Sequence, residues 1–110
     1  MAFRGDLDAL ILGVLGTGRM HGYEISKRIN EGAEDSIRVK EAQLYPILHR
    51  LENDGKIEAE WLPQEGKPAR KVYRLTDTGR SALAAKQVEW QKFALSVATL
   101  LGTKPEVSHG

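Results

Sequence analysis

The sequence of 110 residues contains no cysteine. It can therefore form no disulfide, hold no iron–sulfur cluster through thiolates and offer no thiol nucleophile, which fits the reducing cytoplasm. Long hydrophobic runs are also absent, because the longest one, residues 9–12, is far shorter than the roughly 20 residues that span a membrane. The N-terminus lacks the charged-then-apolar order of an export signal. We therefore expect a cytoplasmic protein with no membrane partner.

An excess of charge of one sign is missing too. The chain carries 16 Lys and Arg against 15 Asp and Glu, so its net charge of +1 argues neither for nor against a nucleic-acid partner. The cations are nevertheless uneven, since residues 66–74 contain no acidic residue and hold Lys67, Arg70, Lys71 and Arg74. A chain of this length forms one domain. Such a domain buries only about 65% of its unfolded surface, so we expect stabilisation by a partner subunit.

Residue sets for catalysis or metal binding do not stand out. The three histidines, at positions 21, 49 and 109, form no His-x-x-x-His pair, and without cysteine they have no spacing typical of metal ligands. No Ser/His/Asp set and no pair of carboxylates with a pocket can be identified. We therefore expect no enzyme, no metal and no cofactor.

What the sequence does contain is a clear order of helices and strands. Apolar spacing predicts helices over residues 6–15, 22–31, 41–53 and 77–101, the last of them capped by Thr76. Alternating residues predict half-buried strands over 57–62 and 71–75, joined by a turn-rich loop over 63–70. In the second helix Tyr23, Ile25 and Ile29 should point inward, and Trp61 should pack within the hairpin. Tyr23 and Tyr73 could instead each contact a phosphate.

The third helix carries a regular apolar stripe at positions i, i+3, i+4 and i+7, formed by Leu44, Ile47, Leu48 and Leu51. Pro46 conflicts with this pattern, because a proline beyond the first turn removes a backbone donor and crowds the turn before it. Two interpretations are open at this point. Either the helix bends at Ala42, or its regular part begins near Gln43.

Three helices, a two-stranded hairpin with a basic tip and a final helix are typical of a winged helix-turn-helix. We predict a mainly α member of the α+β class. Residues 1–76 would form the winged helix-turn-helix domain, 77–102 a C-terminal dimerisation helix and 103–110 a disordered tail. The third helix would enter the major groove of DNA. The loop of the hairpin would act as the wing and place cations on an adjacent backbone or minor groove; we call the whole hairpin at 57–75 the wing.

Three groups of residues follow this frame in order: His21-Gly22-Tyr23-Glu24-Ile25, then Leu44-Tyr45-Pro46 with Leu48, Arg50, Leu51, Glu52 and Gly55, and finally Tyr73-Arg74-Leu75-Thr76 with Gly79. Together they resemble the PadR family of bacterial transcriptional regulators over about residues 5–101. The single long last helix resembles the compact subgroup of that family. The resemblance implies a homodimer that binds pseudo-palindromic operators in double-stranded DNA, usually as a repressor. It also implies that a small molecule relieves repression in some members.

Residues of the third helix that lie off the apolar stripe are the candidates for DNA contact: Lys40, Gln43, Tyr45, His49 and Arg50. Glutamine can bond adenine edges, arginine can bind guanine or a phosphate, and a tyrosine hydroxyl can bond a phosphate. The alternative is a solvated helix face, with His49 or Arg50 paired to Glu52 or Glu24. On the wing, we expect phosphate contacts from Lys67, Arg70 and Lys71.

The predicted dimer interface lies on the first and last helices and contains Leu7, Ile11, Leu83, Trp90, Phe93, Val97 and Leu101. Trp90 and Phe93 have two compatible interpretations: they form dimer core, or they form an aromatic wall for a small, flat, apolar or aromatic effector. The function we predict is a sequence-specific DNA-binding transcriptional regulator, with a repressor as the expected kind. The alternative is a winged-helix module that binds a small molecule or a protein but no DNA.

Overall fold

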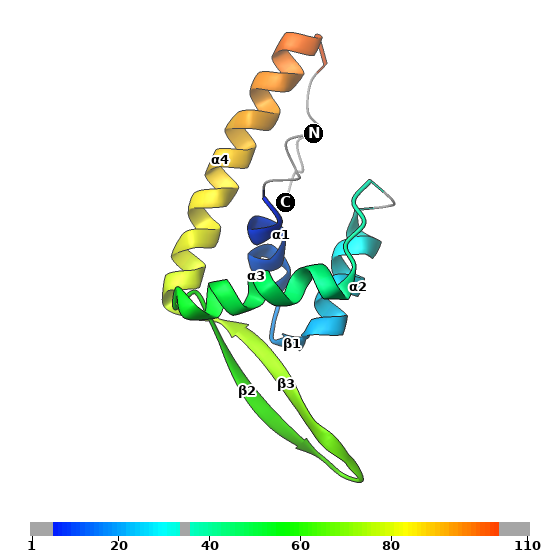
Figure 1. Cartoon of the computed structure of the whole chain (residues 1–110). Helices are drawn as coiled ribbons and strands as arrows, with labels where there is room; N and C mark the ends of the chain where they lie inside the picture. Colours follow the sequence, from blue (N-terminus) through cyan, green and yellow to red (C-terminus); the bar gives the residue numbers. More distant parts are fainter. Residues whose placement is uncertain (1–5, 34–35, 104–110) are drawn as a thin grey trace.

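Four helices and one small antiparallel sheet make up residues 6–33 and 36–103, the part of the chain that the computed structural model describes (Figure 1). In chain order the elements are α1 (Leu7–Leu15), β1 (Met20–His21), α2 (Gly22–Gly32), α3 (Glu41–Asn53), β2 (Ile57–Gln64), β3 (Lys67–Leu75) and α4 (Asp77–Leu101). The prediction of a mainly α member of the α+β class is confirmed. The predicted tail begins at residue 103, and its remainder, 104–110, lies outside the described residues.

The helices match their sequence predictions closely. Helices α3 and α4 have the predicted bounds, α1 begins one residue late because Asp6 is its N-cap, and α2 runs one residue further. Pro46 lies inside α3 without interrupting it, so the late start near Gln43 is wrong. The carbonyl that lacks a donor because of this proline belongs to Ala42, an exposed residue that water can reach.

The sheet differs from the predicted two-stranded hairpin in two respects. A third strand, β1, pairs with β3 through Met20–Tyr73 and His21–Val72, which gives the order β1-β3-β2. The predicted loop over 63–70 is also wrong, because β2 and β3 continue to a tight turn at residues 65–66, where Gly66 has a φ of +71°.

The prolines that suggested a loop are accommodated within the hairpin. The register of β2 and β3 is irregular between Leu62 and Gln64, the position of Pro63. Only Val72 and Tyr73 of β3 pair with β1, and Pro68 lies outside this pairing. Pro68 therefore costs the sheet no hydrogen bond to β1, although it has no N–H to donate. The wing is therefore a long two-stranded arm whose turn at residues 65–66 lies away from the helices (Figure 1).

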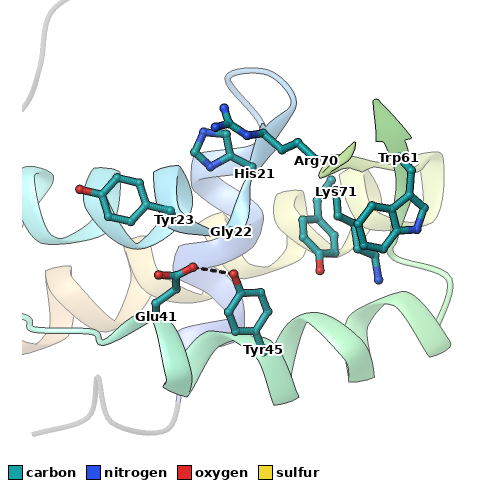
Figure 2. Close-up of a pocket in the computed structure, with 9 residues that line it drawn as sticks. His21, Gly22, Tyr23, Glu41, Tyr45, Trp61, Arg70 and Lys71 are labelled. Atoms are coloured by element: carbon teal, nitrogen blue, oxygen red, sulfur yellow. Dashed lines mark hydrogen bonds between the residues drawn. The ribbon is translucent and has the colours of Figure 1, made fainter. Parts of the chain in front are cut away.

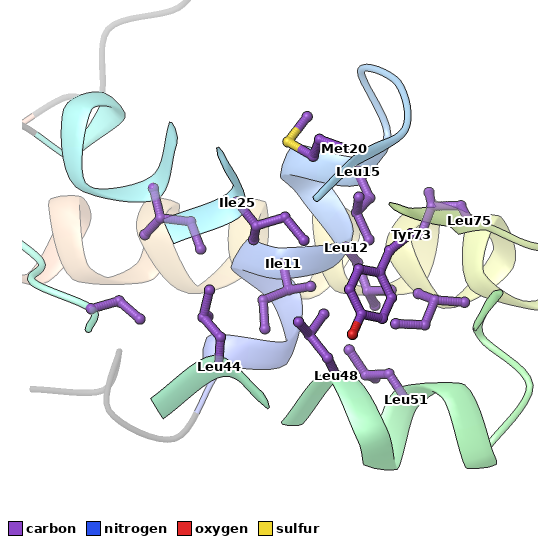
Figure 3. Close-up of a cluster of buried hydrophobic side chains, with 13 residues drawn as sticks. Ile11, Leu12, Leu15, Met20, Ile25, Leu44, Leu48, Leu51, Tyr73 and Leu75 are labelled. Atoms are coloured by element: carbon purple, nitrogen blue, oxygen red, sulfur yellow. The ribbon is translucent and has the colours of Figure 1, made fainter. Parts of the chain in front are cut away.

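The core lies where α1, α2, α3 and the base of the wing meet (Figure 3). Its centre is formed by buried aliphatic side chains from all three helices, with Tyr73 and Leu75 added from β3. The leucines of α3 that face this core are Leu44, Leu48 and Leu51, as predicted. Of the two predictions for Tyr23, the inward one is wrong, since Tyr23 is 58% exposed at the start of α2.

The start of α4 is fixed to the turn between α3 and β2 by a compact set of contacts. The Thr76 hydroxyl accepts a bond from the N–H of Gly79 at 3.0 Å, which confirms the predicted cap, and donates one to the carbonyl of Gly55 at 2.6 Å. Gly79 packs so tightly that a Cβ there would lie 1.9 Å from the carbonyl oxygen of Lys56. Beyond this anchor α4 runs past α1 and extends away from the rest of the chain (Figure 1).

Candidate nucleic-acid interface

The outer face of α3 is formed by four exposed residues, Ala42, Pro46, His49 and Asn53. Each residue of a helix turns by about 100°, which places these four opposite the buried leucines. His49 belongs to the predicted contact set and lies at the centre of this face. Asn53 was not predicted, although the i, i+4 spacing from His49 would have identified it, and its amide can bond adenine edges.

Gln43 lies on one edge of that face and has a local role. Its side-chain oxygen accepts a hydrogen bond from the backbone N–H of Lys40 at 2.8 Å. In a full capping box the side chain of the N-cap residue would also accept a hydrogen bond from the N–H of residue 43. The N-cap here is Lys40, whose side chain has no acceptor, so only the bond to Gln43 forms. Gln43 thereby satisfies one of the exposed donors at the start of α3. To bond a base with both amide atoms, Gln43 has to leave this cap.

Arg50 lies on the same edge of α3 and is held in place by a residue of α1. Its guanidinium donates to both carboxylate oxygens of Asp8, in the first turn of α1, at 2.5 and 2.6 Å. The predicted alternative of an ion pair was therefore right in kind, but the partner is Asp8 rather than Glu52 or Glu24. More than half of the Arg50 side chain is still exposed.

Tyr45 lies on the opposite edge and lines a hollow between α2, α3 and the wing (Figure 2). Its hydroxyl donates a hydrogen bond to the Glu41 carboxylate at 2.6 Å. That bond is the first cause that raises the pKa of Tyr45 to about 12, and burial adds to the rise. A Cβ on Gly22 would lie only 2.9 Å from the Tyr45 hydroxyl, so the ring packs directly on the backbone where α2 begins.

This hollow, which we call the α2–α3–wing hollow, has a volume of 590 Å³ and is open to solvent. Its walls combine aromatic, basic and acidic side chains: His21, Gly22, Tyr23, Glu41, Tyr45, Trp61, Arg70, Lys71 and Tyr73. Figure 2 shows side chains of α2, α3 and β3 around one space. The hollow therefore joins α3 and the wing in one surface.

The wing cations differ from one another. Lys67 and Arg70 are exposed, and within residues 6–33 and 36–103 neither forms an ion pair. Lys71 is half-buried, and its ammonium lies 3.5 Å from Glu52 Oε1. The same ammonium lies 5.8 Å from the ring centre of Trp61, its cross-strand partner on β2, although Trp61 is 65% exposed. Lys71 therefore ties the wing to α3, and a carboxylate already offsets its charge.

His21 has a structural role. Its Nδ1 accepts a hydrogen bond from the N–H of Glu24 at 3.3 Å, so it caps α2. In the described part of the chain no three His, Cys, Asp or Glu side chains are placed to hold a metal ion. None of the described helices is both long enough and apolar enough to cross a membrane.

The predicted dimer residues fall into two groups. Ile11 is 0% exposed inside its own chain, so its assignment to a dimer interface is wrong: the apolar character of α1 serves the core at this point. Leu7 and Leu83 are partly buried against that core. The others lie on α4, where Phe93, Val97 and Leu101 are exposed and Trp90 is half-buried. The prediction did not include Leu100, which is 86% exposed.

Trp90 and Phe93 form an edge-to-face pair with ring centres 5.3 Å apart. Phe93 is exposed and Trp90 is half-buried. The Trp90 indole N–H donates to the carboxylate of Asp6, and Lys86 lies 3.1 Å from the same carboxylate. Trp90 therefore fastens α4 to α1 within one chain, in addition to any contact with a partner.

Comparison with known proteins gives a consistent picture. Residues 11–85 match the family described as "Transcriptional regulator PadR-like family". An uncharacterised protein X of Lysinibacillus sphaericus is 38% identical over 87 residues, which cover 79% of this chain and 80% of that protein. The negative transcriptional regulator PadR of Bacillus subtilis is 36% identical over 73 residues, which cover 66% of this chain but only 40% of that protein.

Solved structures agree with the sequence matches. A transcriptional regulator from Clostridium thermocellum superposes with a TM-score of 0.79 and 32% identity, over 89% of this chain and 92% of that one. Bacillus subtilis PadR in complex with operator DNA superposes with a TM-score of 0.69 and 33% identity, over 74% of this chain and 45% of that one. The first of these has nearly the same extent as this chain, whereas PadR is more than twice as long as the shared part.

Proposed function

Because this chain belongs to the PadR-like family of transcriptional regulators, we propose that two copies of it bind a pseudo-palindromic operator in double-stranded DNA. Each copy would insert the outer face of α3 into a major groove and lay its wing on the adjacent backbone. The observation that supports this most directly is the α2–α3–wing hollow. It places Tyr45 of α3 and Arg70 of the wing around one open space, so a single DNA surface could contact both.

Within this interface the residues divide by role. Base contacts would come from the outer face of α3, where His49 and Asn53 are exposed and Gln43 and Arg50 lie at the edge. Phosphate contacts would come from Lys67 and Arg70, whose charges are not offset by a carboxylate among the described residues. Lys71 would act through the position of the wing, since it is engaged with Glu52 and Trp61.

The dimer that this operator requires would form through α4, with α1 beside it. The exposed apolar residues of α4 form a stripe near its C-terminal end, including Phe93, Val97, Leu100 and Leu101. A soluble protein rarely exposes such a continuous stripe, so a second copy of α4 is its natural cover. Two-fold symmetry would then place the two copies of α3 about one turn of DNA apart, roughly 34 Å.

Repression and its relief would follow from this geometry. A dimer on an operator blocks transcription by occupying the site, and the Bacillus subtilis relative is itself a negative regulator. A small, flat, apolar or aromatic effector would bind at Trp90 and Phe93, where an exposed ring lies at the dimer face. By separating the two α4 helices it would change the spacing of the two α3 helices. We place the protein in the cytoplasm, where it meets chromosomal DNA.

The test is fluorescence anisotropy with a labelled duplex from the DNA upstream of the chain's own gene. The expected result is specific binding, at least about 10³-fold tighter than to a scrambled duplex, that weakens steeply as salt rises from 50 to 200 mM. Absence of binding to either duplex would overturn this function. It would favour the alternative, a winged-helix module that binds only a small molecule or a protein.

A further inference from the structure

The α2–α3–wing hollow contains an acidic residue where an interface for DNA would be expected to hold only basic and neutral ones. Glu41 lines it together with Tyr23, Tyr45 and Arg70 (Figure 2). Tyrosine hydroxyls and arginine are common donors to DNA phosphates. A carboxylate among them repels the same phosphates, so the acidic residue needs an explanation beyond the proposed DNA contact.

The Glu41 carboxylate has a fixed position. Glu41 is the first residue of α3 and is partly buried. It accepts the hydroxyl hydrogen of Tyr45, one turn later in the same helix, at 2.6 Å. Tyr45 in turn packs on the backbone of Gly22, where no side chain could fit beside it. The acceptor, the hydroxyl and the start of α2 therefore hold one another in place.

This arrangement has two consequences for a phosphate in the hollow. The carboxylate opposes the phosphate by direct repulsion. It also occupies the hydroxyl of Tyr45, which would otherwise be free to donate to that phosphate. Arg70, on the other wall, is not paired with a carboxylate among residues 6–33 and 36–103. A phosphate in the hollow would therefore be attracted by Arg70 and repelled by Glu41.

The structure assigns to Glu41 the role of a residue that opposes DNA phosphates and weakens binding to DNA of every sequence. This inference rests on the proposed function. Phosphates are the same in every sequence, so a residue that opposes them lowers affinity for all DNA. An operator offsets this loss through base contacts on the outer face of α3, whereas random DNA cannot. Base contacts therefore set the ratio of the two affinities, and Glu41 lowers both of them, so that only a site with base contacts is bound tightly.

The decisive variant is Glu41→Gln, which removes the charge but keeps an oxygen that can accept the Tyr45 hydroxyl. Two unit charges about 7 Å apart in water repel enough to change an equilibrium about threefold, so a dimer should bind random DNA about tenfold more tightly at low salt. The gain should shrink as salt rises, because salt screens this repulsion. Operator DNA should gain by about the same factor, because it presents the same phosphates.

Controls separate this role from a structural one. Glu31→Gln removes an exposed carboxylate at the other end of α2 and should leave DNA binding unchanged. Glu41→Ala removes both charge and acceptor and should reproduce the gain, with the Tyr45 hydroxyl released. Thermal unfolding of each variant shows whether the fold is kept. Loss of folding in both Glu41 variants would make Glu41 a structural residue and overturn the inference.

The remaining outcomes are distinct. If the unchanged chain binds DNA and Glu41→Gln binds random DNA with the same affinity at low salt, the inference fails and the proposed function stands. If Glu41→Gln weakens operator binding while random DNA is unaffected, Glu41 reads a base and the inference is again wrong. If the unchanged chain binds no DNA, the proposed function fails and this inference with it.

Discussion

The indole N–H of Trp90 donates a hydrogen bond to the carboxylate of Asp6. Asp6 is the N-cap of α1 and Trp90 lies near the middle of α4, so one bond joins residues 84 positions apart. Lys86, one turn before Trp90, forms an ion pair with the same carboxylate. Burial raises the pKa of Asp6, but the bonds from Trp90 and Lys86 outweigh burial and hold that pKa below its ordinary value.

Asp6 should therefore make stability depend on pH in acid. Because its pKa is lower in the folded chain than in the unfolded one, its contribution is fully present above the ordinary value of 3.8. It is lost as pH falls through the folded value. Asp6→Asn should lower the free energy of unfolding at pH 7 by roughly 1.5–3 kcal/mol, as for a hydrogen bond to a charged group.

Urea unfolding at pH 7 and pH 3 measures this effect. The difference between the unchanged chain and Asp6→Asn should be clear at pH 7 and smaller at pH 3. Asp54→Asn, at an exposed carboxyl after α3, is the matched control and should behave like the unchanged chain. An equal loss from Asp6→Asn at both pH values would mean that the charge of Asp6 is not what stabilises the junction.

The start of α4 should tolerate no side chain at Gly79. A Cβ there would lie 1.9 Å from the backbone oxygen of Lys56, and a backbone atom cannot move aside cheaply. Gly79→Ala should therefore lower the unfolding free energy by about 1–3 kcal/mol, as overpacking does. Gly32→Ala is the control, since nothing lies near the added carbon at the end of α2. Similar melting temperatures for the two variants would contradict the close packing.

Structure that depends on residues close in sequence could be predicted, whereas contacts between residues far apart in the chain could not. The stripe of Leu44, Leu48 and Leu51 repeats with the period of a helix, and Thr76 caps the helix that follows it, so local pattern was sufficient for α3 and α4. The bond between Trp90 and Asp6 leaves no local signal. From sequence, Trp90 appeared as an apolar residue for an interface, and its polar N–H had no visible partner.

The sheet shows a second limit. Strand β1 has two residues, too few for an alternating pattern, and it exists because Met20 and His21 lie beside the middle of β3. Pro63 and Pro68 suggested a loop, yet an irregular register and the short length of β1 leave room for both in strands. Likewise, periodicity placed Arg50 at the surface, but only the packing of α1 on the domain brings Asp8 to it.

Lys67 and Arg70 should contribute to DNA affinity in a way that depends on salt. Each phosphate contact adds about 0.9 to the slope of log K against log salt, so replacing both by Ala should flatten it by up to about 1.8 per subunit. Lys71→Ala should flatten it less, because Glu52 already offsets that charge. Lys92→Ala, on α4, is the control. An unchanged slope in the double variant would remove the wing from the interface.

The ion pair between Asp8 and Arg50 should limit DNA binding by the recognition helix. Asp8→Asn removes the charge that holds the guanidinium, and a released Arg50 can reach a phosphate. The salt slope should then steepen by up to about 0.9 per subunit. The increase should disappear in the double variant Asp8→Asn/Arg50→Ala, which serves as the control. If Asp8→Asn alone leaves the slope unchanged, Arg50 is not available to DNA even when released.

The dimer is best tested at the far end of α4. Trp90 is a poor site for this test, because its replacement also breaks the bond to Asp6 within one chain. Leu100 and Leu101 are 86% and 73% exposed, and they continue the stripe that begins at Phe93. Nothing else in the described chain covers them, so a second copy of the helix is expected to do so. Their replacement should separate the subunits without disturbing the core.

Sedimentation should show a dimer of the unchanged chain at tens of micromolar and a monomer of Leu100→Glu/Leu101→Glu. Thr99→Glu, on the other side of α4, adds the same kind of charge and should stay dimeric. The monomer should bind operator DNA at least about 100-fold more weakly, because the second half-site is no longer bound by a tethered partner. Its affinity for random DNA should fall less. If the unchanged chain sediments as a monomer, the proposed dimer is wrong. The pseudo-palindromic operator then loses its physical basis, because a palindrome in the DNA matches a two-fold axis in the protein that binds it.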